Sequence, residues 1–97
     1  MKPLGFSPKA SADLDAIADY IAEDNPRRAQ SFIEELLAVC AEIPARPKGY
    51  PARTELGKGV RVALHGRYMV FFRDLPNEIR IERVLHGARD LVRAFKE

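Results

Sequence analysis

One segment organises the whole chain: Ile79-Arg80-Ile81-Glu82-Arg83-Val84-Leu85-His86-Gly87-Ala88-Arg89-Asp90. Apolar and charged residues alternate through its first half, which is the pattern of a β-strand with one buried face. The pair His86-Gly87 has turn chemistry and ends the strand. We therefore expect this strand to bring an imidazole and two guanidinium groups to one end of a small sheet.

Composition favours a single globular domain over residues 1–97. Apolar residues make up 46% and charged residues 31% of the chain, as in folded proteins. The single Cys40 cannot form an internal disulfide, which fits a reducing cytoplasm. There is no apolar run near the roughly 18 residues that span a bilayer, and residues 1–6 do not resemble a signal peptide. We expect a cytoplasmic domain with no membrane partner.

Charge is unevenly distributed along the sequence. Residues 1–45 hold four basic and eight acidic side chains, whereas residues 46–97 hold twelve basic and six acidic ones. A basic half suits a polyanion or an acidic protein partner. It equally suits two faces that attract each other within the fold, and composition leaves both interpretations open.

Two amphipathic helices are predicted in the first half. Ser7-Pro8 and Asn25-Pro26 each combine an N-cap residue with proline at the first helical position. The first apolar stripe comprises Ala10, Leu14, Ile17, Ala18 and Ile21, and that helix is expected to end near Asp24. The second comprises Ala29, Phe32, Ile33, Leu36, Leu37, Cys40 and Ile43, and ends at Pro44. Cys40 lies on this stripe, so we expect a core residue and not a nucleophile.

The second half has the two-residue period of strands, after a proline-rich loop over residues 44–52. Strands are predicted at 53–56, 60–65, 68–73 and 78–85, with 2–6 as a further edge or first strand. Segment 68–73 is the most apolar and is expected to be central. Short turns make successive strands antiparallel neighbours, and 91–95 is expected to form a docked helical turn or a strand-like tail. The predicted fold is α+β, ordered β-α-α-β-β-β, with an antiparallel sheet and an N-terminal helical hairpin packed on one face.

Motifs for metal and cofactor chemistry are missing from the sequence. It has no cysteine pair, no His-x-x-His spacing, no phosphate-binding Gly-Lys-Ser/Thr loop, no Gly-x-Gly-x-x-Gly and no Gly-x-Ser-x-Gly. Gly57-Lys58-Gly59 is interpreted as a hairpin turn. We expect no cofactor and no metal.

A basic set on the predicted sheet remains: Arg61, His65, Arg67, Arg73, Arg80, Arg83, His86 and Arg89. Arg61, Ala63 and His65 share one strand face by the two-residue period. Such a face could bind phosphates and, with histidine as a proton carrier, cleave RNA. The alternative is a solvated strand face. For His86 we favour a structural role, in which the imidazole holds the turn by bonding a backbone carbonyl, over contact with a target.

The ordered motifs resemble ParE-type toxins of the RelE/ParE superfamily of bacterial toxin–antitoxin modules. The resemblance rests on Ser7–Ala10, Asp13–Ile17, Tyr20-Ile21, Asn25–Ala29, Gly59–Arg61, Gly66–Arg73 and Arg83–Asp90. It covers nearly the whole chain, and Arg-Val-Leu-His-Gly-x-Arg-Asp at 83–90 is its most specific part.

The resemblance implies both a partner and a target. The implied partner is a ParD-like antitoxin that folds onto the toxin, and the implied target of a ParE-type member is DNA gyrase, which it poisons without catalytic residues of its own. RelE-type relatives instead imply ribosome-dependent mRNA cleavage, for which Arg61, Arg83 and His86 are the candidate residues. Tyrosine occurs only at 20, 50 and 68, so the C-terminal tyrosine of RelE-type sites is missing. A third possibility is a non-toxic module that only binds antitoxin.

Two sets of contact residues are expected, and no sequence-specific DNA binding by the toxin alone. The target-binding candidates are Arg83, His86, Arg89 and Asp90. The antitoxin-binding candidates are Leu14, Ile17, Tyr20, Ile21, Arg61, Arg67, Tyr68 and Phe72. We expect an acidic, amphipathic antitoxin helix to meet a basic sheet edge near Arg61, Arg67 and Arg83.

Overall fold

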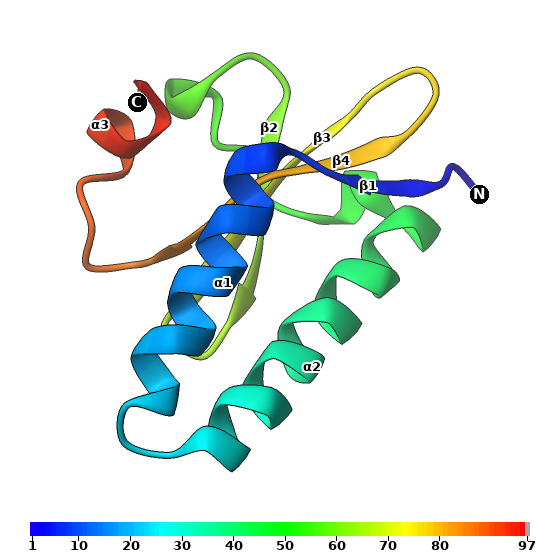
Figure 1. The fold of residues 1–97 in the computed structure, drawn as a ribbon. Coiled ribbons are helices and arrows are strands. Elements are labelled where there is room, and N and C mark those ends of the chain that lie inside the picture. The colour runs from blue at the N-terminus through cyan, green and yellow to red at the C-terminus, as the bar shows by residue number, and fades with distance from the viewer. Residues whose placement is uncertain (97) are drawn as a thin grey trace.

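A helical hairpin packs on one face of a four-stranded sheet, and a short C-terminal helix packs on the other (Figure 1). The computed structural model describes residues 1–96. Its elements are β1 (Leu4–Phe6), α1 (Pro8–Ala22), α2 (Pro26–Glu42), β2 (Val60–His65), β3 (Tyr68–Asp74), β4 (Ile79–His86) and α3 (Leu91–Lys96). The predicted α+β order is confirmed.

Side-chain caps start both long helices as the sequence predicts. The Ser7 hydroxyl accepts a hydrogen bond from the N–H of Ala10 at 3.0 Å, and the Asn25 side chain accepts one from Arg28 at 3.1 Å. Each cap satisfies a helix N–H that has no partner within the helix. Helix α1 ends at Ala22, two residues before the predicted end.

The sheet is mixed, whereas an antiparallel sheet was predicted. The strand order is β1-β4-β3-β2, with β3 and β4 central and β1 parallel to β4. The β2–β3 and β3–β4 pairs are antiparallel, as the short turns predicted. The chain passes through two helices between β1 and its neighbour β4, and this long crossover is what allows the parallel pairing.

The predicted strand at 53–56 is wrong. Thr54–Leu56 forms a 3₁₀ turn, and only Ala52 makes a bridge to Arg61 on β2. Leu56 is buried under α3, and the left-handed Gly59 turns the chain into β2. The preceding residues cover part of the β2 edge, because the N–H of Val62 donates to the carbonyl of Pro51 at 3.0 Å.

Two apolar cores lie on opposite faces of the sheet. The larger core joins α1 and α2 to Ala63, Val70, Phe72, Ile79, Ile81 and Val84. The smaller core joins α3 and Leu56 to Val60, Val62, Phe71 and Leu85. Cys40 is fully buried in the larger core, as predicted, and burial raises the pKa of its thiol to about 11. The docked helical turn expected at the C-terminal end is confirmed as α3.

A bulge in β4 changes which way its side chains point. Phe71 pairs with Arg83 but Phe72 pairs with Ile81, so Glu82 is an extra residue in the ladder. Ile79, Ile81 and Val84 therefore all face the helical hairpin, although strict alternation would have separated Val84 from the other two.

Candidate partner-binding site

Arg83 links three elements instead of facing solvent. Its Nε and Nη2 donate to the carboxylate of Asp13 on α1 at 2.8 and 3.0 Å, and its Nη1 donates to the carbonyl of Ala94 on α3 at 2.6 Å. Only 11% of the Arg83 side chain is exposed. The N–H of Val84 also donates to Asp13, at 2.9 Å. Arg83 therefore has a structural role, and its predicted contact with a target stays a prediction.

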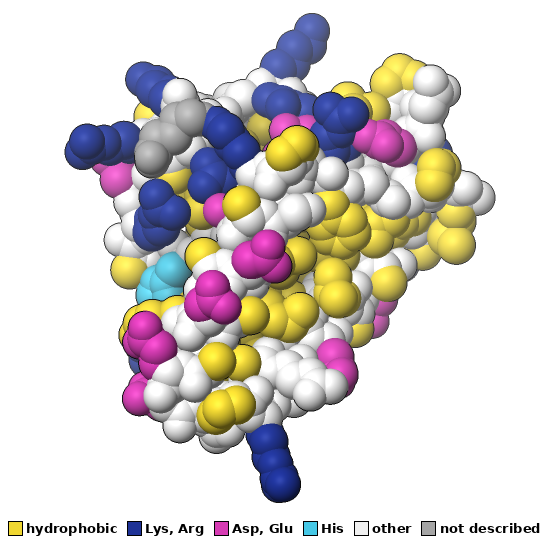
Figure 2. All heavy atoms as spheres, viewed as in Figure 1, with side chains coloured by type: hydrophobic (Ala, Val, Ile, Leu, Met, Phe, Trp, Pro, Cys, Tyr) yellow, Lys and Arg dark blue, Asp and Glu magenta, His cyan; other side chains and the backbone are white. Residues whose placement is uncertain are grey.

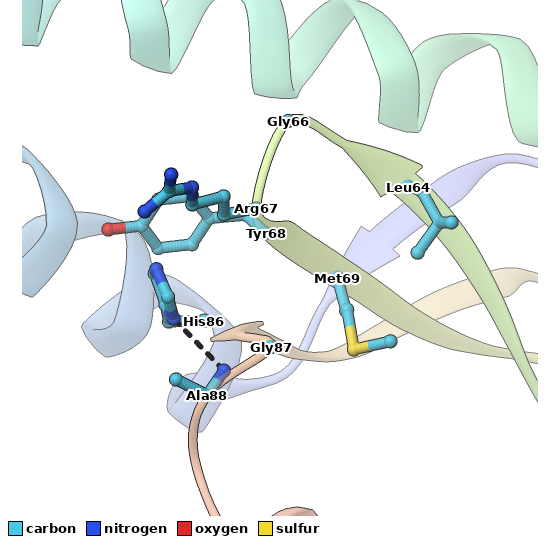
Figure 3. Close-up of a pocket in the computed structure, with 8 residues that line it drawn as sticks. All are labelled: Leu64, Gly66, Arg67, Tyr68, Met69, His86, Gly87 and Ala88. Atoms are coloured by element: carbon cyan, nitrogen blue, oxygen red, sulfur yellow. Dashed lines mark hydrogen bonds between the residues drawn. The ribbon is translucent and has the colours of Figure 1, made fainter.

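His86 holds the turn, as favoured, but by a different bond. Its Nδ1 accepts a hydrogen bond from the N–H of Ala88 at 3.0 Å, whereas a bond to a backbone carbonyl was expected (Figure 3). The turn at Gly87 directs the N–H of Ala88 back toward the imidazole ring. The N–H of Gly87 donates a hydrogen bond to the carbonyl of Arg67. Because Nδ1 accepts, the proton of the neutral ring lies on Nε2.

The remaining target-binding candidates follow β4 into α3. Asp90 caps α3, since its carboxylate accepts from the N–H of Arg93 at 3.2 Å. Arg89 and His86 both line a small depression of about 160 Å³ beside Tyr20. The predicted target set thus divides into a structural pair, Arg83 and Asp90, and a pair at the surface depression, His86 and Arg89.

The predicted basic face of β2 is not an open surface. Ala63 is 3% exposed in the core under the helices. Arg61 donates to the carbonyl of Tyr50 at 2.7 Å, and His65 lies 2.7 Å from Glu35 on α2. The alternation correctly placed these residues on one face, but that face packs on the helical hairpin.

The three nuclease candidates do not meet. Arg61 pairs in register with Phe72 and His86 with Tyr68, four positions apart on β3 and about 13 Å along the strand. The guanidinium of Arg83 is bound to the carboxylate of Asp13 and the carbonyl of Ala94. Arg61 lies near the start of β2 and Arg67 in the turn after its end, so Arg61, Arg67 and Arg83 do not form one cluster, and their contact with an antitoxin stays a prediction.

Two of the antitoxin-binding candidates are too buried to contact a partner. Phe72 is fully buried and Ile17 is 7% exposed, because both lie in the core between hairpin and sheet. Leu14, Ile21 and Tyr68 are half-buried, and Tyr20 is 69% exposed. The half-buried and exposed members remain candidates for contact with a partner.

An apolar groove runs between the two long helices. Glu35 on α2 reaches β2 through His65, so the opposite flank of α2, with Ile33 and Leu37, faces α1. On α1 the flank turned toward α2 carries Leu14 and Ile21. Figure 2 shows apolar side chains exposed between the helices and acidic side chains along α1. Leu37 is 41% exposed and adds apolar surface to this groove.

A second depression lies where the tip of the hairpin meets the end of the sheet, and we name it the Tyr20 pocket. It has a volume of about 720 Å³ and is lined by Tyr20, Ile21, Arg28, Phe32, Arg67, Tyr68 and His86. Sequence reasoning missed Arg28 and Phe32, although their four-residue spacing on α2 places them on one helix face. The pocket joins two helices, the β2–β3 turn and the end of β4.

Hydrogen bonds and ring contacts fix the walls of the Tyr20 pocket. The Arg28 guanidinium lies 5.0 Å from the centre of the Phe32 ring and binds the carboxylate of Glu35. Hydrogen bonds from Arg28 and then His65 lower the pKa of Glu35 from 4.5 to about 2. The Tyr68 ring makes edge contacts with Phe32 at 5.4 Å and His86 at 5.2 Å, and burial raises the pKa of its hydroxyl.

Residues 1–96 contain neither a cluster of metal-ligand side chains nor a helix suited to a membrane. No three His, Cys, Asp or Glu side chains in this range come together as a possible metal site. No helix in the described part of the chain has the length and apolarity needed to cross a bilayer.

Two solved structures are similar to this fold. The chain is similar to one from the chromosomal ParDE toxin–antitoxin system of P. aeruginosa, with a TM-score of 0.75 and 27% identity over 89% of this chain and 96% of that chain. YafQ from E. coli shares the fold, with a TM-score of 0.52 and 17% identity over 91% and 96% of the two chains. No curated protein matches the sequence. The first of these similarities is to a chain of a toxin–antitoxin system, and the second is one of fold alone.

The family follows from the sequence profile. The profile of the ParE toxin of type II toxin–antitoxin systems, parDE, matches residues 4–91, and the chain belongs to this family. The resemblance noted from the sequence motifs is confirmed.

Proposed function

We propose that this ParE-family toxin poisons DNA gyrase, performs no catalytic chemistry of its own, and is neutralised by a ParD-like antitoxin. The observation that carries the proposal is the family match across residues 4–91. Gyrase acts on DNA in the cytoplasm, which is where we place the toxin's action.

The geometry of the basic residues supports action by binding over RNA cleavage. General acid–base cleavage needs its groups within hydrogen-bond reach of one reacting centre. Arg61 and His86 lie on different strands, opposite residues at the two ends of β3. The guanidinium of Arg83 is bound to Asp13 and the carbonyl of Ala94. The surface pair His86 and Arg89 instead suits contact with a protein or a protein–DNA complex.

The groove between α1 and α2 supports binding of an antitoxin helix. An amphipathic helix binds such a groove through apolar residues at positions i, i+3 or i+4, and i+7. Half-buried apolar residues on both helices, among them Leu14, Ile21 and Ile33, together with the exposed Leu37, provide the matching surface. The similar chain in P. aeruginosa is part of a ParDE system.

A supercoiling and cleavage assay tests the gyrase proposal directly. Purified toxin is incubated with DNA gyrase, ATP and relaxed plasmid. We expect loss of supercoiling and accumulation of linear, protein-linked DNA, and we expect added antitoxin to prevent both. Unaffected gyrase together with cleavage of ribosome-bound mRNA would contradict the proposal and identify a nuclease. Inactivity in both assays together with tight antitoxin binding would identify a non-toxic binding module.

A further inference from the structure

The Tyr20 pocket contains two nitrogen donors with no acceptor of their own. The Arg67 guanidinium is exposed and has no hydrogen bond or ion pair to any residue from 1 to 96. His86 uses Nδ1 to accept from Ala88, so the N–H of its neutral ring is at Nε2. Figure 3 shows that this second nitrogen points toward Arg67 and Tyr68. By contrast, Arg28 is already neutralised by Glu35.

The other walls of the pocket are aromatic and largely fixed. The Tyr68 ring makes edge contacts with the rings of both Phe32 and His86, and Tyr20 projects with 69% of its surface exposed. Rigid aromatic walls bind a large apolar side chain with little loss of conformational entropy. A donor pair beside such walls matches a carboxylate adjacent to a large apolar side chain.

We propose that the Tyr20 pocket is the anchor site for an acidic residue of the antitoxin that is flanked by a large apolar residue. The carboxylate binds Arg67 and the Nε2 hydrogen of His86, and the apolar side chain lies against Tyr20 and Tyr68. The inference rests on the proposed antitoxin partner and assigns to it an anchor outside the groove between the helices.

Charge around the pocket favours a peptide over a nucleic acid. Asp19 precedes Tyr20 on α1, Glu23 is the C-cap residue of the same helix, and both are exposed. A nucleic acid carries a negative charge at every nucleotide and would be repelled along this helix. A peptide can present one carboxylate to Arg67 and otherwise neutral groups.

Antitoxin affinity measured by calorimetry provides the first test. We expect Arg67→Glu to weaken binding of the antitoxin from the same operon about tenfold or more, because it replaces an attractive pair by a repulsive one. Tyr20→Ala should weaken it by a similar factor through loss of an exposed aromatic anchor. Arg46→Glu is the matched control, since Arg46 is an exposed arginine remote from the pocket, and it should bind as wild type. Both pocket variants alter exposed side chains, and their unfolding temperatures should equal that of the wild type.

A second test is independent of the antitoxin. In nuclear magnetic resonance spectra, acetyl-Glu-Phe-amide at millimolar concentration should shift the ring resonances of Tyr68 and His86 saturably. Acetyl-Gln-Phe-amide should cause no such shift in the wild type, and acetyl-Glu-Phe-amide should cause none in the Arg67→Glu variant.

Wild-type affinity for antitoxin in both pocket variants would overturn the assignment of the pocket but not the proposed function. If the wild type did not bind antitoxin, the proposed function would fail, and the dipeptide shifts would still decide the chemistry of the pocket. Binding of oligothymidylate that is lost in Arg67→Glu, with no dipeptide shift, would overturn the peptide assignment in favour of a nucleic acid.

Discussion

The Asp13 carboxylate stabilises the part of β4 that β1 does not reach. Strand β1 pairs only with residues 79–81, and beyond them Asp13 accepts hydrogen bonds from the backbone of Val84 and from the side chain of Arg83. A side chain of α1 therefore replaces the missing strand neighbour. The Asp13 and Arg83 side chains are only 12% and 11% exposed. Because water has little access to either charge, each charge is stabilised mainly by the other.

We predict that Asp13→Ala destabilises the fold by about 3 kcal/mol, because it leaves the Arg83 guanidinium and the N–H of Val84 without their acceptor. Urea unfolding followed by circular dichroism measures the change. Asp15→Ala, at an exposed position on the same helix, should change the free energy of unfolding by less than about 0.5 kcal/mol. Equal effects of the two substitutions would show that the Asp13–Arg83 pair contributes nothing.

We predict a pH-dependent contribution of Glu35 to stability. Its pKa is lowered from 4.5 to about 2 in the folded state, so its stabilisation is complete above pH 4.5 and is lost as the pH falls toward 2. The unfolding temperature of wild type should exceed that of Glu35→Gln at pH 7, and the two should converge by about pH 2. Because the Glu35 side chain is 39% exposed, added salt should narrow the difference at pH 7. Glu34→Gln, at the exposed neighbouring position, serves as the control; a gap that persists at pH 2 would argue against the charge pairing.

At the scale of single residues, the sequence predicted which side chains lie together on one face of a strand. It did not predict which other element packs on that face. Alternation grouped Arg61, Ala63 and His65 correctly, yet both faces of β2 are covered, one by α2 and the other by α3. The β4 bulge at Glu82 has no signature in the sequence, such as a glycine, and it places Val84 on the same face as Ile79 and Ile81. The Tyr20 pocket combines residues from two helices and two strands, a juxtaposition that only the tertiary fold creates.

At the scale of elements, local chemistry predicted the long helices well and the short segments less well. Ser7-Pro8 and Asn25-Pro26 start helices because their caps act within a few residues. Segment 53–56 was too short for its period to distinguish a strand from a 3₁₀ turn. The pairing of β1 depends on residues more than 70 positions away, so no local pattern could reveal that it is parallel.

Helix α3 is held mainly by its apolar side, and we predict that Phe95→Ala destabilises the protein by about 1–3 kcal/mol. The Phe95 ring packs edge-on to Phe71 at 5.1 Å and covers the smaller core. The substitution should also increase binding of an apolar dye to the exposed sheet face. Val92→Ala, at a position on α3 that is 45% exposed, should have little effect on either measurement. Equal stability of both variants would mean that α3 does not contribute to the core.

At the scale of the whole molecule, the proposed contacts lie on two surfaces that meet at His86 and Tyr20. The groove between α1 and α2 lies away from Arg89, whereas His86, at the end of β4, and Tyr20 line both the Tyr20 pocket and the depression that Arg89 lines. The acidic half of the sequence forms the helical hairpin, and most of the basic half forms the sheet and α3. A partner that covers both regions blocks the toxin, and a substitution away from the shared border, at Leu37 or at Arg89, should affect only one interaction.

The last prediction is that two single substitutions separate antitoxin binding from gyrase poisoning. Leu37→Asp places a charge in the groove between the helices, where desolvation on binding an apolar helix face is unfavourable. Because Leu37 is 41% exposed in the free toxin, we expect little change in stability. The variant should still poison gyrase in the cleavage assay but should require about tenfold or more antitoxin for protection. Arg89→Glu should show the opposite behaviour, with antitoxin affinity close to wild type and reduced gyrase poisoning. If both variants lost both properties with unfolding temperatures unchanged, a single shared surface would have to replace the two proposed here.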